Sequence, residues 1–239
     1  MKPPSTRIAI LDSVPKIYWK EDNGITDGEK FIDLLSPVNP NAIFDIFYVS
    51  ENHFPDSIGD YDAYLLTGSP VSVHDDYEWI NTLSAWIVNI YKSEKPMFGV
   101  CFGHQLIAKC FGGRIDKCAN GWMIGNYEMQ LNSPPSWLNT SLSRSSIFHF
   151  NKERITQLPD LAQSFAASNG YANFAYTLGE NIACLQGHPE QPKRAMYNFL
   201  NAVIHSLSKS DIERANLCIE NGRPDSVIWA QSIMQFLCR

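Results

Sequence analysis

Short apolar runs alternate with longer helical patterns through the first half of the chain. The apolar runs predict buried strands at Ile8–Leu11, Ala42–Val49, Ala63–Leu66 and Met97–Val100. Apolar residues at every third or fourth position predict helices between them, at Glu29–Leu35, Tyr77–Tyr91 and Leu106–Phe111. Strands separated by helices in this order are typical of a parallel sheet covered on both faces, so the pattern predicts an α/β fold.

The second half of the chain is richer in strand patterns and ends in helices. Strands are predicted at Trp122–Leu131, Ser145–Phe150, Ser164–Ser168, Phe174–Thr177 and Ile182–Gln186, and helices at Lys193–Leu207 and Asp225–Leu237. The sequence contains no internal repeat, no low-complexity tract and no linker-like stretch. A chain of 239 residues can bury a substantial core. We therefore expect residues 1–239 to form a single domain, with a helical C-terminal extension from about residue 200.

Composition and charge exclude several classes of partner. With 19 basic and 25 acidic residues the net charge is −6, and no basic stripe is present, so we expect no nucleic-acid partner. No apolar run approaches the ~20 residues that span a bilayer, and no signal-peptide pattern precedes the first strand, which predicts a cytoplasmic protein without a membrane partner. The spacing of the cysteines fits neither a disulfide framework nor a zinc site, so no metal is expected. The six are Cys101, Cys110, Cys118, Cys184, Cys218 and Cys238.

Cys101 lies in a context that differs from those of the other cysteines. The segment Gly99-Val100-Cys101-Phe102-Gly103 has the form Gly-x-nucleophile-x-Gly where a predicted strand meets a predicted helix. Glycine is needed on both sides, because a Cβ there would collide with the neighbouring strand or helix. The turn would place the thiol at a helix N-terminus, whose partial positive charge favours the thiolate. Cys101 is therefore the candidate nucleophile, and the backbone N–H of Phe102 could face an oxyanion.

A thiol nucleophile needs a base, and His188-Pro189-Glu190 follows the predicted strand Ile182–Gln186. In an extended chain, side chains two residues apart project to the same side, so Glu190 could hold the imidazole of His188 while His188 takes the proton of Cys101. A His-x-Glu pair is common by chance and often lies in a solvated turn. Its position, at the end of a strand that could lie beside that of Cys101, favours the catalytic interpretation.

Three motifs together resemble a known family, the class I (triad) glutamine amidotransferase domain. They are Gly99–Gln105, Gln186–Glu190 and the turn Thr67–Pro70. The similarity is greatest to the stand-alone kind related to the glutaminase domain of GMP synthase, and it runs from about Ile8 to Asn198. The resemblance implies a flavodoxin-like three-layer sandwich, with a central, mostly parallel sheet and helices on both faces, and it implies no cofactor.

The resemblance also implies roles for particular residues. Cys101, His188 and Glu190 would form the triad, and the thiolate would attack the side-chain amide of glutamine. Ammonia would leave, and water would hydrolyse the γ-glutamyl thioester. The oxyanion would be held by backbone N–H groups of Phe102 and of the Gly68–Ser69 turn. Gln105 matches the position that contacts the glutamyl group of the substrate, whereas from its position alone it could be a polar helix residue facing solvent.

The chain departs from the family pattern at two places. Asn151 and Glu153 occupy the positions of a His-x-Asp pair that the family usually carries, and Ser69 replaces a glycine of the oxyanion turn while keeping the backbone donor. His104, near Cys101, is expected to pack or to form a supporting hydrogen bond. The remaining histidines and aromatic residues are expected to be structural: His74, His149 and His205, and in the core Trp79, Trp86 and Trp122.

Several hypotheses about function stay open at this stage. Ammonia could pass to a separate synthase subunit, or the same thioester chemistry could hydrolyse γ-glutamyl bonds in small peptides. A non-catalytic binding protein on the same scaffold is a third hypothesis, although such proteins typically lose the nucleophile or the base. A more distant class of cysteine hydrolases takes its histidine from beside the nucleophile, which here would make His104 the base instead of His188.

Overall fold

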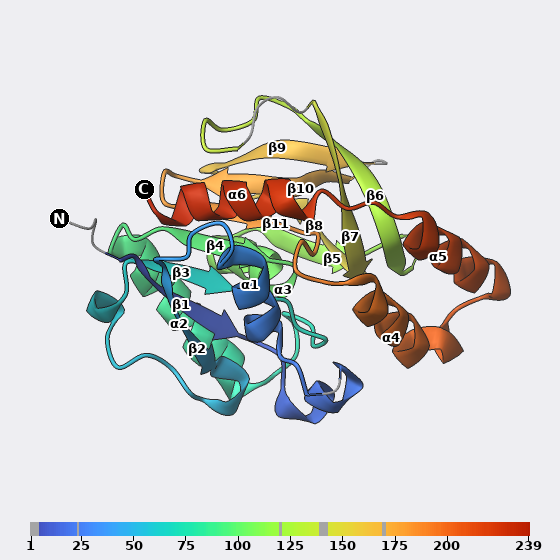
Figure 1. Cartoon of the computed structure of the whole chain (residues 1–239), viewed down its shortest axis with the longest axis horizontal. Coiled ribbons are helices and arrows are strands. Elements are labelled where there is room, and N and C mark those ends of the chain that lie inside the picture. Colours follow the sequence, from blue (N-terminus) through green and yellow to red (C-terminus); the bar gives the residue numbers. More distant parts are fainter. Residues whose placement is uncertain (1–4, 23, 120, 139–142, 169–170) are drawn as a thin grey trace.

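A central β-sheet organises the computed structural model, which describes residues 5–22, 24–119, 121–138, 143–168 and 171–239 (Figure 1). Within these residues the sheet has nine strands in the order β2-β1-β3-β4-β11-β10-β9-β6-β7. The strands of one half pair in parallel: β2 (Ile43–Tyr48), β1 (Arg7–Asp12), β3 (Ala63–Leu66), β4 (Met97–Val100) and β11 (Ile182–Leu185).

The other half of the sheet is antiparallel. From β11 outward it consists of β10 (Tyr171–Leu178), β9 (Ala162–Ser168), β6 (Met123–Leu131) and β7 (Arg144–Asn151). A separate antiparallel pair is formed by β5 (Arg114–Lys117) and β8 (Glu153–Gln157). Because the turn from β10 to β11 reverses the chain, β11 rejoins the parallel half directly beside β4, and this pairing positions the candidate site.

Helices cover both faces of the parallel half. Residues of β1 alternate between the two layers: Ile8 and Ile10 pack in one hydrophobic cluster, and Ala9 and Leu11 pack in the other. The first cluster includes residues of α1 (Asp27–Leu35) and α6 (Ser226–Leu237), and the second includes residues of α2 (Glu78–Lys92) and α3 (Phe102–Cys110). This is the three-layer α/β arrangement that the sequence predicts, and Figure 1 shows α1 and α6 on the near face.

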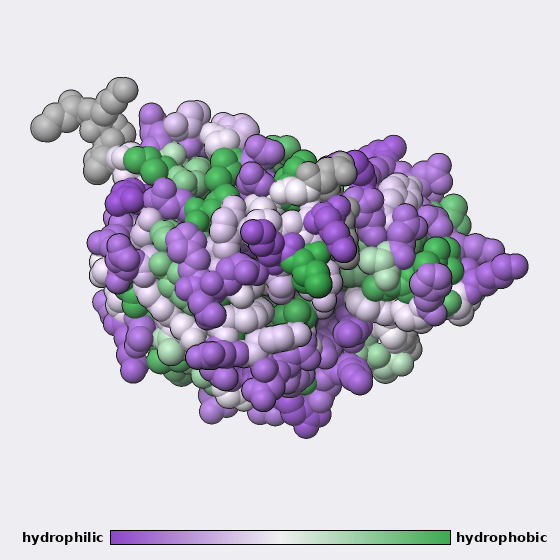
Figure 2. Space-filling model, turned by 90° about the horizontal axis from the view of Figure 1, so that it is seen from below, coloured by the Kyte–Doolittle hydropathy of each residue, from purple (hydrophilic) through white to green (hydrophobic). Residues whose placement is uncertain are grey.

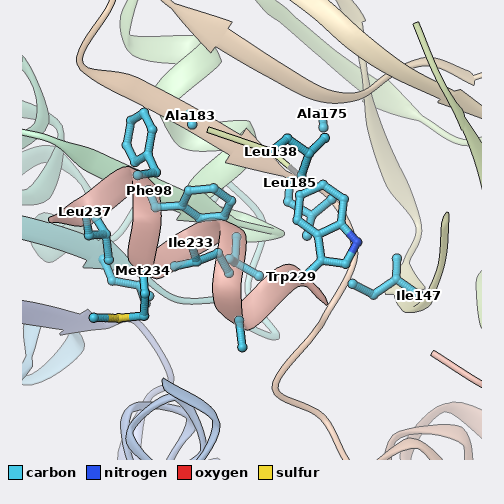
Figure 3. Packing of buried hydrophobic residues seen from close by; sticks show 14 of the residues in the cluster. Phe98, Leu138, Ile147, Ala175, Ala183, Leu185, Trp229, Ile233, Met234 and Leu237 are labelled. Atoms are coloured by element: carbon cyan, nitrogen blue, oxygen red, sulfur yellow. The ribbon is translucent and has the colours of Figure 1, made fainter. Parts of the chain in front are cut away.

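Helix α6 closes one face of the sheet near the C-terminus. Trp229, Ile233 and Leu237 recur at helical spacing and are all buried, and they point toward Phe98 of β4 and its neighbours (Figure 3). Each such side chain contributes roughly 1.5–3 kcal/mol by leaving water. The indole Nε1 of Trp229 donates a hydrogen bond to Ser145 Oγ at 3.0 Å, which satisfies its polar atom inside the core.

A smaller cluster packs α4 (Lys193–Val203) and α5 (Lys209–Asn221) against β6 and β7. Met196 and Leu200 of α4 are buried there together with Ile219 of α5. Helix α5 comes so close to β6 that a Cβ built at Gly125 would lie 2.4 Å from Cys218 Cβ. The 3-10 segments are η1 (Lys16–Asp22), η2 (Val49–Glu51), η3 (Ile58–Asp60) and η4 (Ile204–Ser206).

The strands β5 and β8 and the α-helix α5 were not predicted by the hydrophobic pattern. The strands β5 and β8 are short and carry charged or polar residues at alternate positions, so neither stands out as an apolar run. Helix α5 is polar on most of its surface and buries only Ala215 and Ile219. Helix α3 begins at Phe102, four residues earlier than predicted, because its first turn is the glycine-flanked segment itself. Across the described residues, no helix combines the length and apolarity needed to cross a membrane.

Candidate active site

Cys101 lies at a sharp turn between β4 and α3. Its backbone has φ 49° and ψ −100°, and a positive φ is uncommon for a residue other than glycine. Hydrogen bonds hold the turn on both sides: Cys101 N donates to Leu185 O at 2.9 Å, and Gly103 N donates to Thr67 O at 3.2 Å. Strained backbone that is held by its surroundings is typical of functional sites.

The two flanking glycines are required by close contacts. A Cβ at Gly99 would lie 2.6 Å from Ile107 Cδ1 and 3.0 Å from the carbonyl oxygen of Gly103. A Cβ at Gly103 would lie 2.7 Å from the carbonyl oxygen of Leu66 on β3. These distances are shorter than van der Waals contact, so the predicted collisions with helix and strand are confirmed at both positions.

His188 reaches the site from the strand beside that of Cys101. Because Leu185 of β11 is paired with Val100 of β4, the segments that follow the two strands leave the same edge of the sheet. The Nδ1 atom of His188 lies 2.7 Å from Glu190 Oε1, and both side chains are buried. An ionised carboxylate only accepts hydrogen bonds, so Nδ1 carries the proton and Nε2 is left to exchange one. Among the described residues Nε2 has no hydrogen-bond partner.

Cys101 and His188 both lie close to Gly68. A Cβ at Gly68 would lie 3.0 Å from His188 Cε1 and 3.5 Å from Cys101 Cβ. Burial lowers the pKa of His188, but the charges of Cys101 and Glu190 raise it more, so its pKa lies well above the ordinary value. A protonated imidazole beside a thiolate is the arrangement that makes a cysteine nucleophilic at neutral pH. The structure thus brings together the three residues predicted from the sequence as catalytic.

Behind Glu190, Gln191 links the site to a buried ion pair that sequence reasoning missed. Its Nε2 donates to Glu190 Oε1 at 3.1 Å and to Asp27 Oδ1 at 2.9 Å. Since both neighbours are acceptors, only the amide nitrogen fits between them. Asp27 Oδ1 also accepts from Lys30 Nζ at 2.9 Å. Asp27 is 164 positions from Gln191 in the chain, and no local sequence pattern connects them.

The turn Thr67–Pro70 lies over the thiol and carries the second group of candidate oxyanion donors. Ser69 Oγ donates to the carbonyl oxygen of Ser13 at 2.7 Å, and Ser13 N donates to Thr67 Oγ1 at 2.9 Å, which fastens the turn to the end of β1. Among the described residues, the N–H groups of Gly68, Ser69 and Phe102 have no protein acceptor. They are therefore available to a ligand, in accordance with the predicted positions of the oxyanion donors.

Gln105 is buried, which excludes the solvent-facing alternative. Its Nε2 donates to the carbonyl oxygen of Glu153 at 3.0 Å and to Gln186 Oε1 at 2.9 Å. These two bonds use both N–H groups of the amide, so only its carbonyl oxygen is left to accept a hydrogen bond from a substrate. Asn151 Nδ2 donates to the same Glu153 oxygen at 3.1 Å, and Ser72 Oγ donates to Glu153 Oε2 at 2.8 Å.

Two cavities meet at Cys101. The smaller one, about 50 Å³, is lined by both polar and apolar residues, among them Phe102 and Gln105. The larger one, about 300 Å³, contains His188 and runs between η1 and α4. Several residues line both, namely Ser69, Pro70, Cys101, Trp122, Phe150 and Lys152. Trp79 is buried as predicted, and Trp86 and Trp122 are partly buried and pack against core clusters. Trp122 also lines both cavities, which the sequence did not indicate.

Of the other histidines, His104 is fully buried. Its Nε2 lies 2.9 Å from the carbonyl oxygen of Asn173, so it is engaged away from the thiol in a supporting contact, as predicted. Burial lowers the pKa of His104 to about 3, which makes it a poor base. His149 is also fully buried, with a pKa lowered to about 3 by burial and by the charge of His188. Within the described part of the chain, no cluster of three or more potential ligands could hold a metal ion.

Comparison with known proteins gives a consistent assignment. A family model described as glutamine amidotransferase class-I matches residues 43–203. Gamma-glutamyl peptidase 3 of Arabidopsis thaliana is 25% identical over 204 residues, which cover 81% of this chain and 82% of that protein. The glutamine-hydrolyzing GMP synthase of Porphyromonas gingivalis is 28% identical over 141 residues, which cover 58% of this chain and 27% of the synthase.

The solved structures agree on the architecture. A glutamine amidotransferase of Thermotoga maritima superposes on this chain with a TM-score of 0.77 and 20% sequence identity, covering 98% of this chain and 96% of that chain. At that identity the likeness establishes the fold and leaves the substrate open.

Proposed function

Because the chain belongs to the class I glutamine amidotransferase family, we propose that it hydrolyses the amide bond of a γ-glutamyl compound through a thioester on Cys101. The observation that carries this proposal is that Cys101 and His188 both lie beside Gly68, with Glu190 hydrogen-bonded to His188. Of the classes left open by the sequence, this arrangement favours catalysis over a binding protein, and His188 over His104 as the base.

The first half of the reaction would form the thioester. The thiolate of Cys101 attacks the γ-carboxamide carbon, and a carbon–sulfur bond forms while the carbonyl oxygen becomes an oxyanion. Backbone N–H groups of Phe102 and of the Gly68–Ser69 turn would stabilise this charge, and one such donor contributes about 3–4 kcal/mol in other enzymes. The carbon–nitrogen bond then breaks as His188 gives its proton to the leaving nitrogen.

The second half of the reaction would release glutamate. His188, now neutral, takes a proton from water, and the resulting hydroxide attacks the thioester carbon. The carbon–sulfur bond breaks, the thiolate of Cys101 is restored and His188 is again protonated. Throughout, Glu190 would keep Nδ1 of His188 protonated and the ring in one orientation.

The identity of the leaving amine separates two forms of the proposal. If the amine is ammonia, the chain acts as a glutaminase that passes it to a separate synthase subunit, as the resemblance to GMP synthase suggests. If it is an amino acid or another amine, the chain is a γ-glutamyl peptide hydrolase, in accordance with the names of the plant relatives. We favour the second form, because the cavity that contains His188 is much larger than ammonia requires.

A reducing, cytoplasmic location is part of the proposal. All six cysteines are free thiols in the structure, and such thiols stay reduced in the cytosol. The proposed nucleophile acts only in the reduced state.

The experiment that tests the proposal follows hydrolysis of glutamine and of γ-glutamyl dipeptides by the purified wild type and by Cys101→Ala. The variant should keep its fold and lose all measurable turnover, and a glutamine-like diazo-ketone should label the wild type once, at Cys101. Cys238→Ala, which removes an exposed cysteine remote from the site, is the matched control and should behave as wild type. Labelling of a different cysteine, or full activity of Cys101→Ala, would refute the proposal.

A further inference from the structure

The two cavities beside Cys101 have different chemistry. The smaller cavity is lined by Gln105, Asn151, Glu153 and Ser72, whose amide, carboxylate and hydroxyl groups suit a charged amino-acid head. The larger cavity is distinguished by the rings of Tyr18, Trp19 and Phe199, whereas Trp122 and Phe150 line both cavities. Figure 2 views the molecule from below and shows hydrophobic surface near the centre of this face, among mostly hydrophilic residues.

The position of His188 determines which part of a substrate enters which cavity. In acyl transfer the histidine that takes the thiol proton gives it to the leaving nitrogen, so the leaving amine must lie on the side of the histidine. His188 lines the larger cavity and does not line the smaller one, whereas Phe102 and Gln105 line only the smaller one. The glutamyl group therefore belongs in the smaller cavity, and the leaving amine belongs in the larger one.

The size of the larger cavity is far in excess of what ammonia needs. Its volume is about 300 Å³, while a molecule of the size of water or ammonia needs only roughly 10–15 Å³ of such space. One wall is a continuous aromatic surface: the rings of Trp122 and Phe150 are 4.8 Å apart and those of Phe150 and Phe199 are 5.0 Å apart. Trp19, on η1, uses its indole N–H in a bond to Val14 O at 3.0 Å, so its ring adds apolar surface.

Two charged residues in the wall of the larger cavity compensate each other. Asp27 and Lys30 lie in its wall and form an ion pair at 2.9 Å, which Gln191 extends to Glu190. A substituent on the leaving amine therefore meets rings and a neutralised pair. Lys152, an exposed residue, lies where both cavities open and its Nζ is 5.5 Å from the centre of the Trp122 ring.

We infer that the larger cavity is the leaving-group site for γ-glutamyl amides whose amine carries an aromatic or other bulky apolar substituent. The inference rests on the proposed function and narrows its substrate class. Burying one aromatic ring in such a site should raise kcat/KM by roughly tenfold to a hundredfold over an amide without the ring. The amine could be a simple arylalkylamine or an aromatic amino acid, and the two differ only by a carboxylate beside the nitrogen.

The test compares substrates that differ only in the leaving amine. The γ-glutamyl amides of methylamine and phenethylamine are both secondary amides, so their ratio of kcat/KM reports the contribution of the benzyl group. The dipeptides γ-glutamylglycine and γ-glutamylphenylalanine give the same comparison with the carboxylate present. The pair with the higher kcat/KM shows whether the leaving amine is an arylalkylamine or an aromatic amino acid. We expect the aromatic member to exceed its partner by at least tenfold in one pair.

A cavity-filling variant ties the preference to this site. Ala202→Trp, on α4 in the wall of the larger cavity, should reduce the aromatic-to-small ratio at least tenfold. Asn201→Trp adds the same side chain one position earlier, at an exposed residue outside the cavity lining, and should leave the ratio at the wild-type value.

The outcomes separate the two proposals. Equal kcat/KM within both pairs, equal effects of the two tryptophan variants, or cleavage of glutamine alone overturns the leaving-group assignment and leaves the proposed hydrolysis intact. If no γ-glutamyl compound is cleaved and the diazo-ketone does not label Cys101, the proposed function fails, and the assignment fails with it.

Discussion

Substitution of Gly103 by alanine should damage the oxyanion site before it unfolds the protein. The new Cβ would lie 2.7 Å from Leu66 O and 2.7 Å from Leu66 Cγ. Ordinary contact between such atoms begins near 3.4 Å, so the start of α3 must move away from β3 by several tenths of an ångström. Overpacking of this kind costs about 1–3 kcal/mol, which in a chain of this size lowers Tm by roughly 2–12 °C.

The same displacement carries the N–H of Phe102 away from the oxyanion. A shift approaching 1 Å at a reacting centre can cost roughly a hundredfold in rate, so we expect Gly103→Ala to lose about one to two orders of magnitude in kcat/KM at a temperature where it is fully folded. Circular dichroism melts give Tm, and an amine-release assay with a γ-glutamyl dipeptide gives kcat/KM. Gly59→Ala is the control, because its Cβ would meet Ser57 Oγ at 3.4 Å in ordinary contact. Wild-type Tm and activity in Gly103→Ala would refute the close-approach argument.

Three further predictions concern the charged groups. Glu190→Gln should lower kcat by two to four orders of magnitude, as loss of the orienting carboxylate does in other triads, and it should move the basic limb of the pH profile of kcat/KM to lower pH because the carboxylate holds the pKa of His188 up. Gln191→Leu, which removes one hydrogen bond from Glu190, should lower kcat about tenfold and leave KM nearly unchanged. It should shift the basic limb of the kcat/KM profile less than Glu190→Gln does. If that limb does not shift, Gln191 only packs. Burial and the charge of Asp27 raise the pKa of Asp12 from 3.8 to about 7. Between these two pH values the folded protein therefore binds more protons than the unfolded chain. Its free energy of unfolding should fall as the pH rises from about 4 to 7, by an amount on the order of 4 kcal/mol. Urea unfolding across this range should show a smaller fall for Asp12→Asn, and identical slopes would contradict the assignment.

The parts of the fold that could be predicted from the sequence are those with a regular pattern of burial. The strands β1, β3 and β4 are buried on both faces, so they stand out as continuous apolar runs. Helix α2 has one buried stripe and shows a clear helical period. Helix α5 could not be found in this way, because only two of its side chains are buried and the contact with β6 depends on Gly125, which lies far away in the chain.

A similar division applies to the candidate site. Cys101 and its glycines could be predicted because the steric requirement is local, and His188 with Glu190 because they are two residues apart. The walls of the larger cavity come from η1, α1, β7 and α4, and Trp122 lies next to a strand of the core. No local pattern shows that an aromatic residue packed against a core also faces a cavity, so the cavity position of Trp122 could not be predicted.

The pairing of β4 with β11 has a consequence for the evolution of this protein. Cys101 and His188 are held by paired strands in the interior, whereas Tyr18, Trp19 and Phe199 of the larger cavity lie on η1 and α4, which contribute nothing to that pairing. Selection can thus act on the two sets of residues separately. After gene duplication, substitutions on η1 and α4 could change the preferred substrate of one copy while the reaction at Cys101 and His188 stayed the same.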